Sequence, residues 1–275
     1  MEYLKAFTIG TSGLVLFQHL APLSLVDIDY YDYSYKAYSI VLPIYYGLWS
    51  MFALFIKNKF NISLRLSLFI ISILSIFSVT YCVYDAKNCN IFGNIICKYN
   101  NKLCKFFSPN KMRKPYSYYT NKEWLLYILR NGSRHLINFN LIIYYFSKYF
   151  SDYYWLKIFI IGSSIFSYFI TYLKVIWKDS ENKINYDYRV FAVIEPFIQG
   201  FDLIISLYIL QNIFKFNLRH SLILWNIIGS FIQTFLAYKY KTYNYTNSEW
   251  LYYFLRTIVT GFIKIIFFYY LINNL

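Results

Sequence analysis

Glu195 and Asp202, two carboxylates within one apolar run, are the residues of this chain best placed for chemistry. They stand seven positions apart, so on a helix their side chains share nearly the same face. A carboxylate in an apolar environment is costly and is retained where it faces protein or water, usually beside a cation. The cations within neighbouring apolar runs are Arg130, Arg134, Arg256 and Lys264.

These charges are open to two interpretations. In the first, a structural ion pair holds two parts of the chain together. In the second, the charges form a polar site on the path of an ion or small solute. The candidate residues of that site are Glu195, Asp202, Arg130, Arg256 and Lys264.

A proline followed by a glycine one turn later occurs twice, as Pro43 with Gly47 and as Pro196 with Gly200. Proline removes a backbone donor and clashes with the preceding turn, so both pairs predict helix kinks. Such kinks serve packing, or they expose carbonyl groups to a central cavity as in the broken helices of transporters.

The remaining reactive side chains give no indication of an enzyme. The four cysteines, in or beside the loop at 86–122, lack the short paired spacing of zinc ligands. They are Cys82, Cys89, Cys97 and Cys104. The three histidines, His19, His135 and His220, lack metal-binding spacing, so we expect them to make polar contacts. Phosphate loops and nucleophile elbows are missing, and we expect neither a catalytic residue nor a metal or other cofactor.

The composition indicates a membrane protein. The 275 residues are 58% hydrophobic and 15% charged, with a mean hydropathy of +0.37. Soluble domains carry about 25% charged residues. We therefore interpret the net charge of +14 as basic loops that attract anionic lipid head groups, with the bilayer and not nucleic acid as the partner.

Eight apolar runs are long enough to cross about 30 Å of hydrocarbon as helices. Helix is expected because the runs are continuous, whereas the strands of a barrel would alternate. The predicted spans lie near 5–25, 37–57, 62–84, 123–147, 154–177, 189–213, 219–240 and 249–272.

The chain repeats itself. The segment from Thr120 to Arg130, TNKEWLLYILR, returns from Thr246 to Arg256 as TNSEWLYYFLR. In each copy we expect Thr or Asn to cap the start of the helix. The Glu that follows, three positions after Thr and two after Asn, is expected to interact favourably with the positive end of the helix dipole. Further matches keep the same order: Phe7, Gly10 and Ser12 with Phe159, Gly162 and Ser164; Pro43 and Gly47 with Pro196 and Gly200; and Lys59-Phe60-Asn61 with Lys215-Phe216-Asn217.

Each copy contains four predicted spans, an even number, so both copies must enter the membrane from the same side. The predicted fold is therefore all-α and polytopic, with about eight transmembrane helices in two tandem parallel four-helix repeats. Residues 1–150 form the first repeat, including the basic cysteine-containing loop at 86–122, and residues 151–275 form the second. Leu42 and Trp49 occupy the positions that match Glu195 and Asp202, so the candidate polar site is one-sided.

Loop charges give an orientation that depends on one loop. Fifteen basic residues fall on the side of the 86–122 loop, which places that side in the cytosol and both termini outside. Without the loop the two sides are nearly equal. The opposite side has eight basic residues: Lys5, Lys57, Lys59, Arg65, Lys148, Lys157, Lys215 and Arg219.

Three segments resemble multi-span membrane proteins of giant DNA viruses of the mimivirus type. They are Phe7-Thr8-Ile9-Gly10-Thr11-Ser12-Gly13 with Gln18-His19, Pro43-Ile44-Tyr45-Tyr46-Gly47, and Arg130-Asn131-Gly132-Ser133-Arg134-His135, in an Asn/Ile/Lys/Tyr-rich chain. The resemblance covers most of the chain and implies a host internal membrane or a virion membrane. It assigns no residue roles.

Two functions follow as hypotheses. The first is a transporter or channel for a small solute or ion, with its site near Glu195 and Asp202. The second is a structural or scaffolding protein of a virion or replication membrane, in which the buried charges only fix packing.

Overall fold

The computed structural model describes residues 1–20, 35–88, 120–164, 195–239 and 245–275. Throughout these residues the regular structure is helical, which confirms the all-α prediction. Apart from 62–63, each of the eight predicted segments is helical where the structure describes it, and their parts at 21–25, 165–177, 189–194 and 240 lie outside the described residues. Cys89, Cys97, Cys104 and most of the loop at 86–122 lie outside the described residues, as does the side chain of Cys82.

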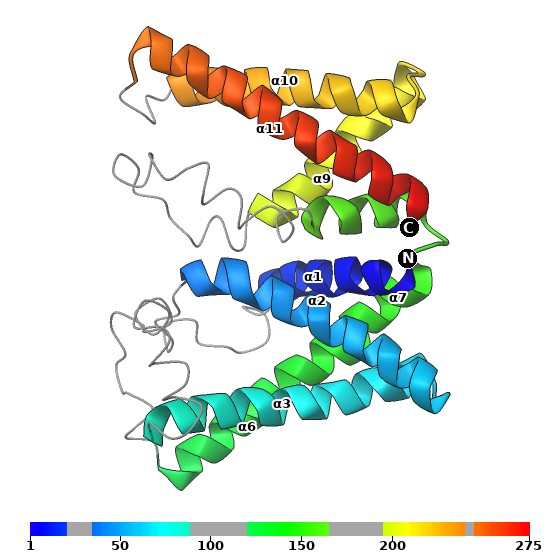
Figure 1. The fold of residues 1–275 in the computed structure, drawn as a ribbon, viewed down its shortest axis with the longest axis vertical. Helices are drawn as coiled ribbons and strands as arrows, with labels where there is room; N and C mark the ends of the chain where they lie inside the picture. The colour runs from blue at the N-terminus through cyan, green and yellow to red at the C-terminus, as the bar shows by residue number, and fades with distance from the viewer. Residues whose placement is uncertain (21–34, 89–119, 165–194, 240–244) are drawn as a thin grey trace.

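Residues 1–150 form four helical rods. Three are single helices, α1 (Glu2–Leu20), α2 (Tyr35–Phe60) and α3 (Leu64–Asn88). The fourth rod is α6 (Asn121–Ile137) continued by a π-helical segment, η4 (Asn138–Ile143), and by α7 (Tyr144–Tyr149). It crosses α3 and ends beside α1 (Figure 1).

Residues 151–275 follow the same order. A helix at 154–164 is followed by α9 (Glu195–Tyr208), which continues into the π-helical η6 (Ile209–Ile213). The last two helices are α10 (Leu218–Lys239) and α11 (Asn247–Asn274). Figure 1 shows that each helix of this half runs in the same direction as its counterpart in the first half.

The start of α11 forms as its sequence predicts. Thr246 is the N-cap: its hydroxyl accepts from the Glu249 backbone N–H at 3.4 Å, and the Glu249 carboxylate accepts from the Thr246 N–H at 2.8 Å. This reciprocal capping box satisfies two donors at the helix end. The predicted capping role of Thr246 and Glu249 is confirmed.

The corners after α2 and η6 correct the sequence match between the halves. Asn61 and Lys215 both have left-handed backbones, with φ of 51° and 59°. Asn61 therefore corresponds to Lys215, and the match of Lys59-Phe60-Asn61 with Lys215-Phe216-Asn217 is wrong by two positions. The stretch from Pro196 to Lys215 is one residue longer than the stretch from Pro43 to Asn61. The π-helical η6 accommodates this residue, because a π turn holds more residues than an α turn.

The first two helices of each half meet through the same glycine and the same phenylalanine. A Cβ on Gly47 would lie 2.6 Å from the Phe7 ring, and a Cβ on Gly200 would lie 2.7 Å from the Phe159 ring. Both glycines therefore permit close helix packing. α2 continues as a helix through Pro43, and the kinks predicted at Pro43 and Pro196 stay predictions.

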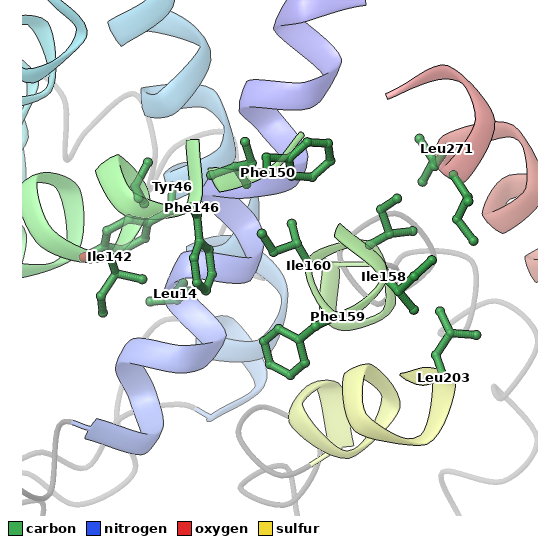
Figure 2. Close-up of a cluster of buried hydrophobic side chains, with 14 of the residues drawn as sticks. Leu14, Tyr46, Ile142, Phe146, Phe150, Ile158, Phe159, Ile160, Leu203 and Leu271 are labelled. Carbon is green, nitrogen blue, oxygen red and sulfur yellow. The ribbon is translucent and has the colours of Figure 1, made fainter. Parts of the chain in front are cut away.

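α1 and the helix at 154–164 lie at the centre and join the two halves (Figure 1). The Ser12 and Ser163 hydroxyls are 2.6 Å apart, and every residue at 8–15 and 158–164 is buried. The apolar core is continuous across this contact. Figure 2 shows Ile158 on the side of Leu203 and Leu271, which belong to the second half.

Judged by length and hydropathy, α11 is the only helix among the described residues that is suited to crossing a membrane. The apolar part of α3, Leu64–Ser78, is shorter. The described residues thus form an all-helical fold in which one helix is long and apolar enough to cross a membrane.

Gly10 offers a direct test of the close packing between α1 and α2. A Cβ at this position would lie 2.5 Å from the Tyr46 carbonyl oxygen, a backbone atom that cannot swing away. We expect Gly10→Ala to lower the unfolding free energy in detergent by about 1–3 kcal/mol, as overpacking does.

Gly229→Ala is the matched control, because nothing lies within 4 Å of a Cβ there. In the interior of α10 this change should stabilise the protein by roughly 0.5–1 kcal/mol. Equal effects of the two substitutions on chemical unfolding would contradict the packing described.

Candidate functional site

The predicted polar residues lie on three helical rods. Glu195 and Asp202 are on α9, Arg130 is on α6, and Arg256 and Lys264 are on α11. The side chains of Glu195 and Arg130 are outside what the structure describes. Arg256 and Lys264 are half-buried, and the Arg256 guanidinium carbon lies 5.7 Å from the centroid of the Tyr253 ring. The grouping of these cations with Glu195 and Asp202 stays a prediction.

Asp202 is held by neutral donors. The Trp225 indole Nε1 donates to one carboxylate oxygen at 2.7 Å, and the Ser206 hydroxyl donates to the other at 3.5 Å. The carboxylate itself is exposed. Trp225 also packs edge-on against Phe268, with ring centroids 5.5 Å apart, so it links α9 through α10 to α11. The sequence did not identify Trp225 as the partner of Asp202.

A second polar cluster lies in the first half, between α2, α3 and α6. The Ser75 hydroxyl is 2.7 Å from the Tyr45 hydroxyl and 2.8 Å from His135 Nδ1. The buried imidazole is stacked on Tyr46, with ring centroids 5.6 Å apart and planes inclined by 11°. The predicted polar contact of His135 is confirmed.

The π-helical η4 brings two asparagines into the same region. Asn140 donates to the Ser72 hydroxyl at 2.9 Å. Asn138 is fully buried, and neither its amide oxygen nor its amide nitrogen has a hydrogen-bond partner in the described part of the chain. Its amide oxygen is directed toward Gly13 of α1, where a Cβ would lie 3.5 Å away.

The second half holds a matching contact between its last two helices. Asn226 on α10 donates to the Ile258 carbonyl oxygen on α11 at 3.3 Å, and the Ser230 hydroxyl donates to Asn226 at 3.4 Å. Gly261 leaves the space that the Asn226 side chain occupies. Third and fourth helices are therefore fastened by polar side chains in both halves.

The chemistry of these clusters is hydrogen bonding. Among the described residues, no three His, Cys, Asp or Glu side chains lie close enough together to bind a metal ion. Asp202 is the one candidate carboxylate whose surroundings are described: it is exposed, and it accepts from two neutral donors.

Sequence reasoning missed Ser75, Asn138 and Asn226. The available signal was a single polar residue in the middle of an apolar run, which in a helix bundle usually marks an interhelical hydrogen bond. Which partner each one meets depends on helix packing, and the sequence does not give that directly.

Comparison of this chain with protein-family models, with curated proteins and with solved structures finds no match.

Ser75→Ala tests the cluster around His135. It removes the hydroxyl that meets the buried imidazole at 2.8 Å. We expect a loss of roughly 1–2 kcal/mol in the unfolding free energy, because a buried polar atom loses its partner. Chemical unfolding in detergent measures it.

The half-buried Ser78, one turn further along α3, provides the control. Ser78→Ala should change the stability by less than about 0.5 kcal/mol. A loss for Ser75→Ala no larger than that of the control would argue against the hydrogen bond.

Proposed function

We propose that this chain is a multi-pass integral membrane protein of two tandem parallel four-helix repeats, and that it transports a cation or a small solute coupled to one. The observation that carries the membrane assignment is the distribution of polarity. Large apolar side chains cover the outside, whereas many of the buried side chains are serine, threonine or asparagine. A surface this apolar suits a bundle surrounded by lipid, in which interior hydroxyl and amide side chains can bond between helices.

α10 illustrates this distribution. Its buried positions include three polar residues, Ser221, Asn226 and Ser230. Six of its exposed residues are large and apolar and recur every three or four positions: Ile227, Ile228, Phe231, Ile232, Phe235 and Leu236. In water such a continuous exposed face would promote aggregation, whereas in hydrocarbon it is favourable.

Three other helices expose the same kind of surface. α11 presents Leu251, Leu255, Val259, Phe262, Ile263 and Ile266; α3 presents Leu66, Phe69, Ile73, Leu74 and Phe77; and α2 presents Leu48, Phe52 and Phe55. On α3 and α10 several polar residues point inward, among them Ser72, Ser75, Asn226 and Ser230, and the large apolar side chains named above face outward.

The tandem arrangement is supported by packing that recurs. Gly47 meets Phe7 in one half, and the equivalent Gly200 meets Phe159 in the other. Ser12 and Ser163 touch where the two halves meet. Counterpart helices run in the same direction in Figure 1, which supports two parallel repeats related by an axis along the helices.

Transport is favoured by the position of Asp202. It lies eleven residues before the end of η6, or roughly 15 Å along the helix, which is about half of the hydrocarbon thickness. An exposed carboxylate at that depth is expensive in lipid and marks an ion or proton pathway in membrane proteins. Its partners Trp225 and Ser206 orient the carboxylate without neutralising its charge.

Asp202→Asn is the direct test. The amide keeps an oxygen that can accept from Trp225, so folding should be preserved, while the charge is lost. Proteoliposomes are loaded with K⁺ or Na⁺ gradients, and a pH-sensitive dye and ion-sensitive dyes report the flux. We expect cation-dependent flux in the wild type and a loss of at least about tenfold in the variant, as removing a binding charge costs more than 1.4 kcal/mol.

Asp152→Asn provides the control, because Asp152 is an exposed carboxylate in the connection between the halves. It should retain wild-type flux. Flux that is unchanged in Asp202→Asn would contradict the transport proposal. Wild-type vesicles without cation flux, or an Asp202→Asn protein that no longer folds, would favour the structural role instead.

A further inference from the structure

One end of the molecule carries both termini (Figure 1), and many basic residues lie near it. The connections 61–63, 150–153 and 214–217 belong to this end. The carboxylates of the described residues here are Glu2, Asp152 and the C-terminus. The basic residues near this end are Lys5, Lys57, Lys59, Arg65, Lys148, Lys157, Lys215 and Arg219.

Lys5 and Lys157 stand apart within this group because they converge. They are separated by the same 152 positions as Phe7 and Phe159, so they are equivalent residues of the two halves. Both ammonium groups lie over the buried ring of Phe150, 4.8 Å and 5.9 Å from its centroid. Lys5 also donates to the Ser151 hydroxyl at 2.8 Å.

The two lysines occupy positions that helix electrostatics disfavour. α1 begins at Glu2 and its neighbour begins at 154, and the Ser12–Ser163 contact shows that these parallel helices start at the same level. Each helix start carries a positive partial charge, which favours anions and repels ammonium groups. Two lysines and two helix starts therefore concentrate positive charge at one point.

The described contacts of the two ammonium groups are to neutral partners, the Phe150 ring and the Ser151 hydroxyl. Glu2 and Asp152 act on Lys5 by electrostatic attraction, and Lys5 in turn repels Lys157. Both lysines are partly buried. An additional anion would balance the positive charge of this pair.

We propose that Lys5 and Lys157 bind the phosphate of an anionic phospholipid head group, with the Ser151 hydroxyl as an additional donor. The inference rests on the membrane placement proposed above, because it is that placement which puts this end at the head-group level. Aromatic side chains are frequent in the connection next to the pair, as they are at membrane interfaces: Tyr149 contacts Tyr153, and Tyr154 contacts Trp155. A lipid bound here would join the two halves at their shared axis.

The test compares two double variants that lose the same charge. Lys5→Gln with Lys157→Gln removes the proposed site, and Lys59→Gln with Lys215→Gln removes two lysines from the corners of the same end. Each purified protein in neutral detergent is titrated with short-chain phosphatidylglycerol or phosphatidylcholine, and native mass spectrometry counts the bound lipids.

We expect the wild type and the corner variant to retain phosphatidylglycerol in preference to phosphatidylcholine. The site variant should bind phosphatidylglycerol about 30-fold more weakly, at about 1 kcal/mol per lysine. Lys5→Arg with Lys157→Arg should keep the preference. Glycerol phosphate should compete only weakly if the acyl chains contribute, which distinguishes a lipid site from a site for free phosphate.

Equal weakening in both double variants would overturn the proposal, because it would show general attraction to a basic surface. Absence of any preference in the wild type would overturn it too. If circular dichroism shows that the double glutamine variant does not fold, the single variants Lys5→Gln and Lys157→Gln are titrated instead. Each should bind phosphatidylglycerol about fivefold more weakly than the wild type. Failure of the wild type to insert into vesicles would instead contradict the membrane placement.

Discussion

The close contact between α1 and the helix at 154–164 is the constraint on which the rest of the structure depends. Only small side chains allow two helices to approach in this way, and Ser12 and Ser163 meet at 2.6 Å. Gly10 and Gly162 then let α2 and α9 pack against the outer sides of this pair. Each half is thereby fixed to the central pair, and the remaining helices are added in the same order on either side (Figure 1).

The distribution of polar and apolar side chains around this central pair suits the proposed membrane environment. Several polar side chains inside the bundle bond across helices, as Ser75 does with His135 and Asn140 with Ser72. Apolar side chains face outward. Asp202 departs from this pattern, since it is a charged group on an exposed surface at mid-length of its helix, with Trp225 and Ser206 orienting it. This departure is where function is proposed.

Much of the helical framework was predictable from the sequence, because the length of an apolar run and a cap such as Thr246 with Glu249 are local properties. The eight segments and the order of the repeat followed from them. The π-helical segments were not predictable, because a one-residue insertion gives no local signal of where the helix absorbs it. The match of Asn61 with Asn217 was wrong for a separate reason, since the letters Lys-Phe-Asn recur two positions beyond the equivalent corner. The partner of Asp202 was missed because the position of Trp225 depends on how α10 packs against α9, which no local pattern specifies.

The central claim is that both halves cross the membrane in the same sense, and cysteine accessibility in sealed vesicles tests it most directly. In a protein whose native cysteines are replaced by serine, single changes Asn61→Cys, Asp152→Cys and Lys215→Cys are exposed to a membrane-impermeant maleimide. The account predicts that all three react from one side of the membrane, and that Thr120→Cys and Asn247→Cys react only from the other. Labelling of Asn61→Cys and Lys215→Cys from opposite sides, or protein that alkaline carbonate extracts from the vesicles, would contradict it.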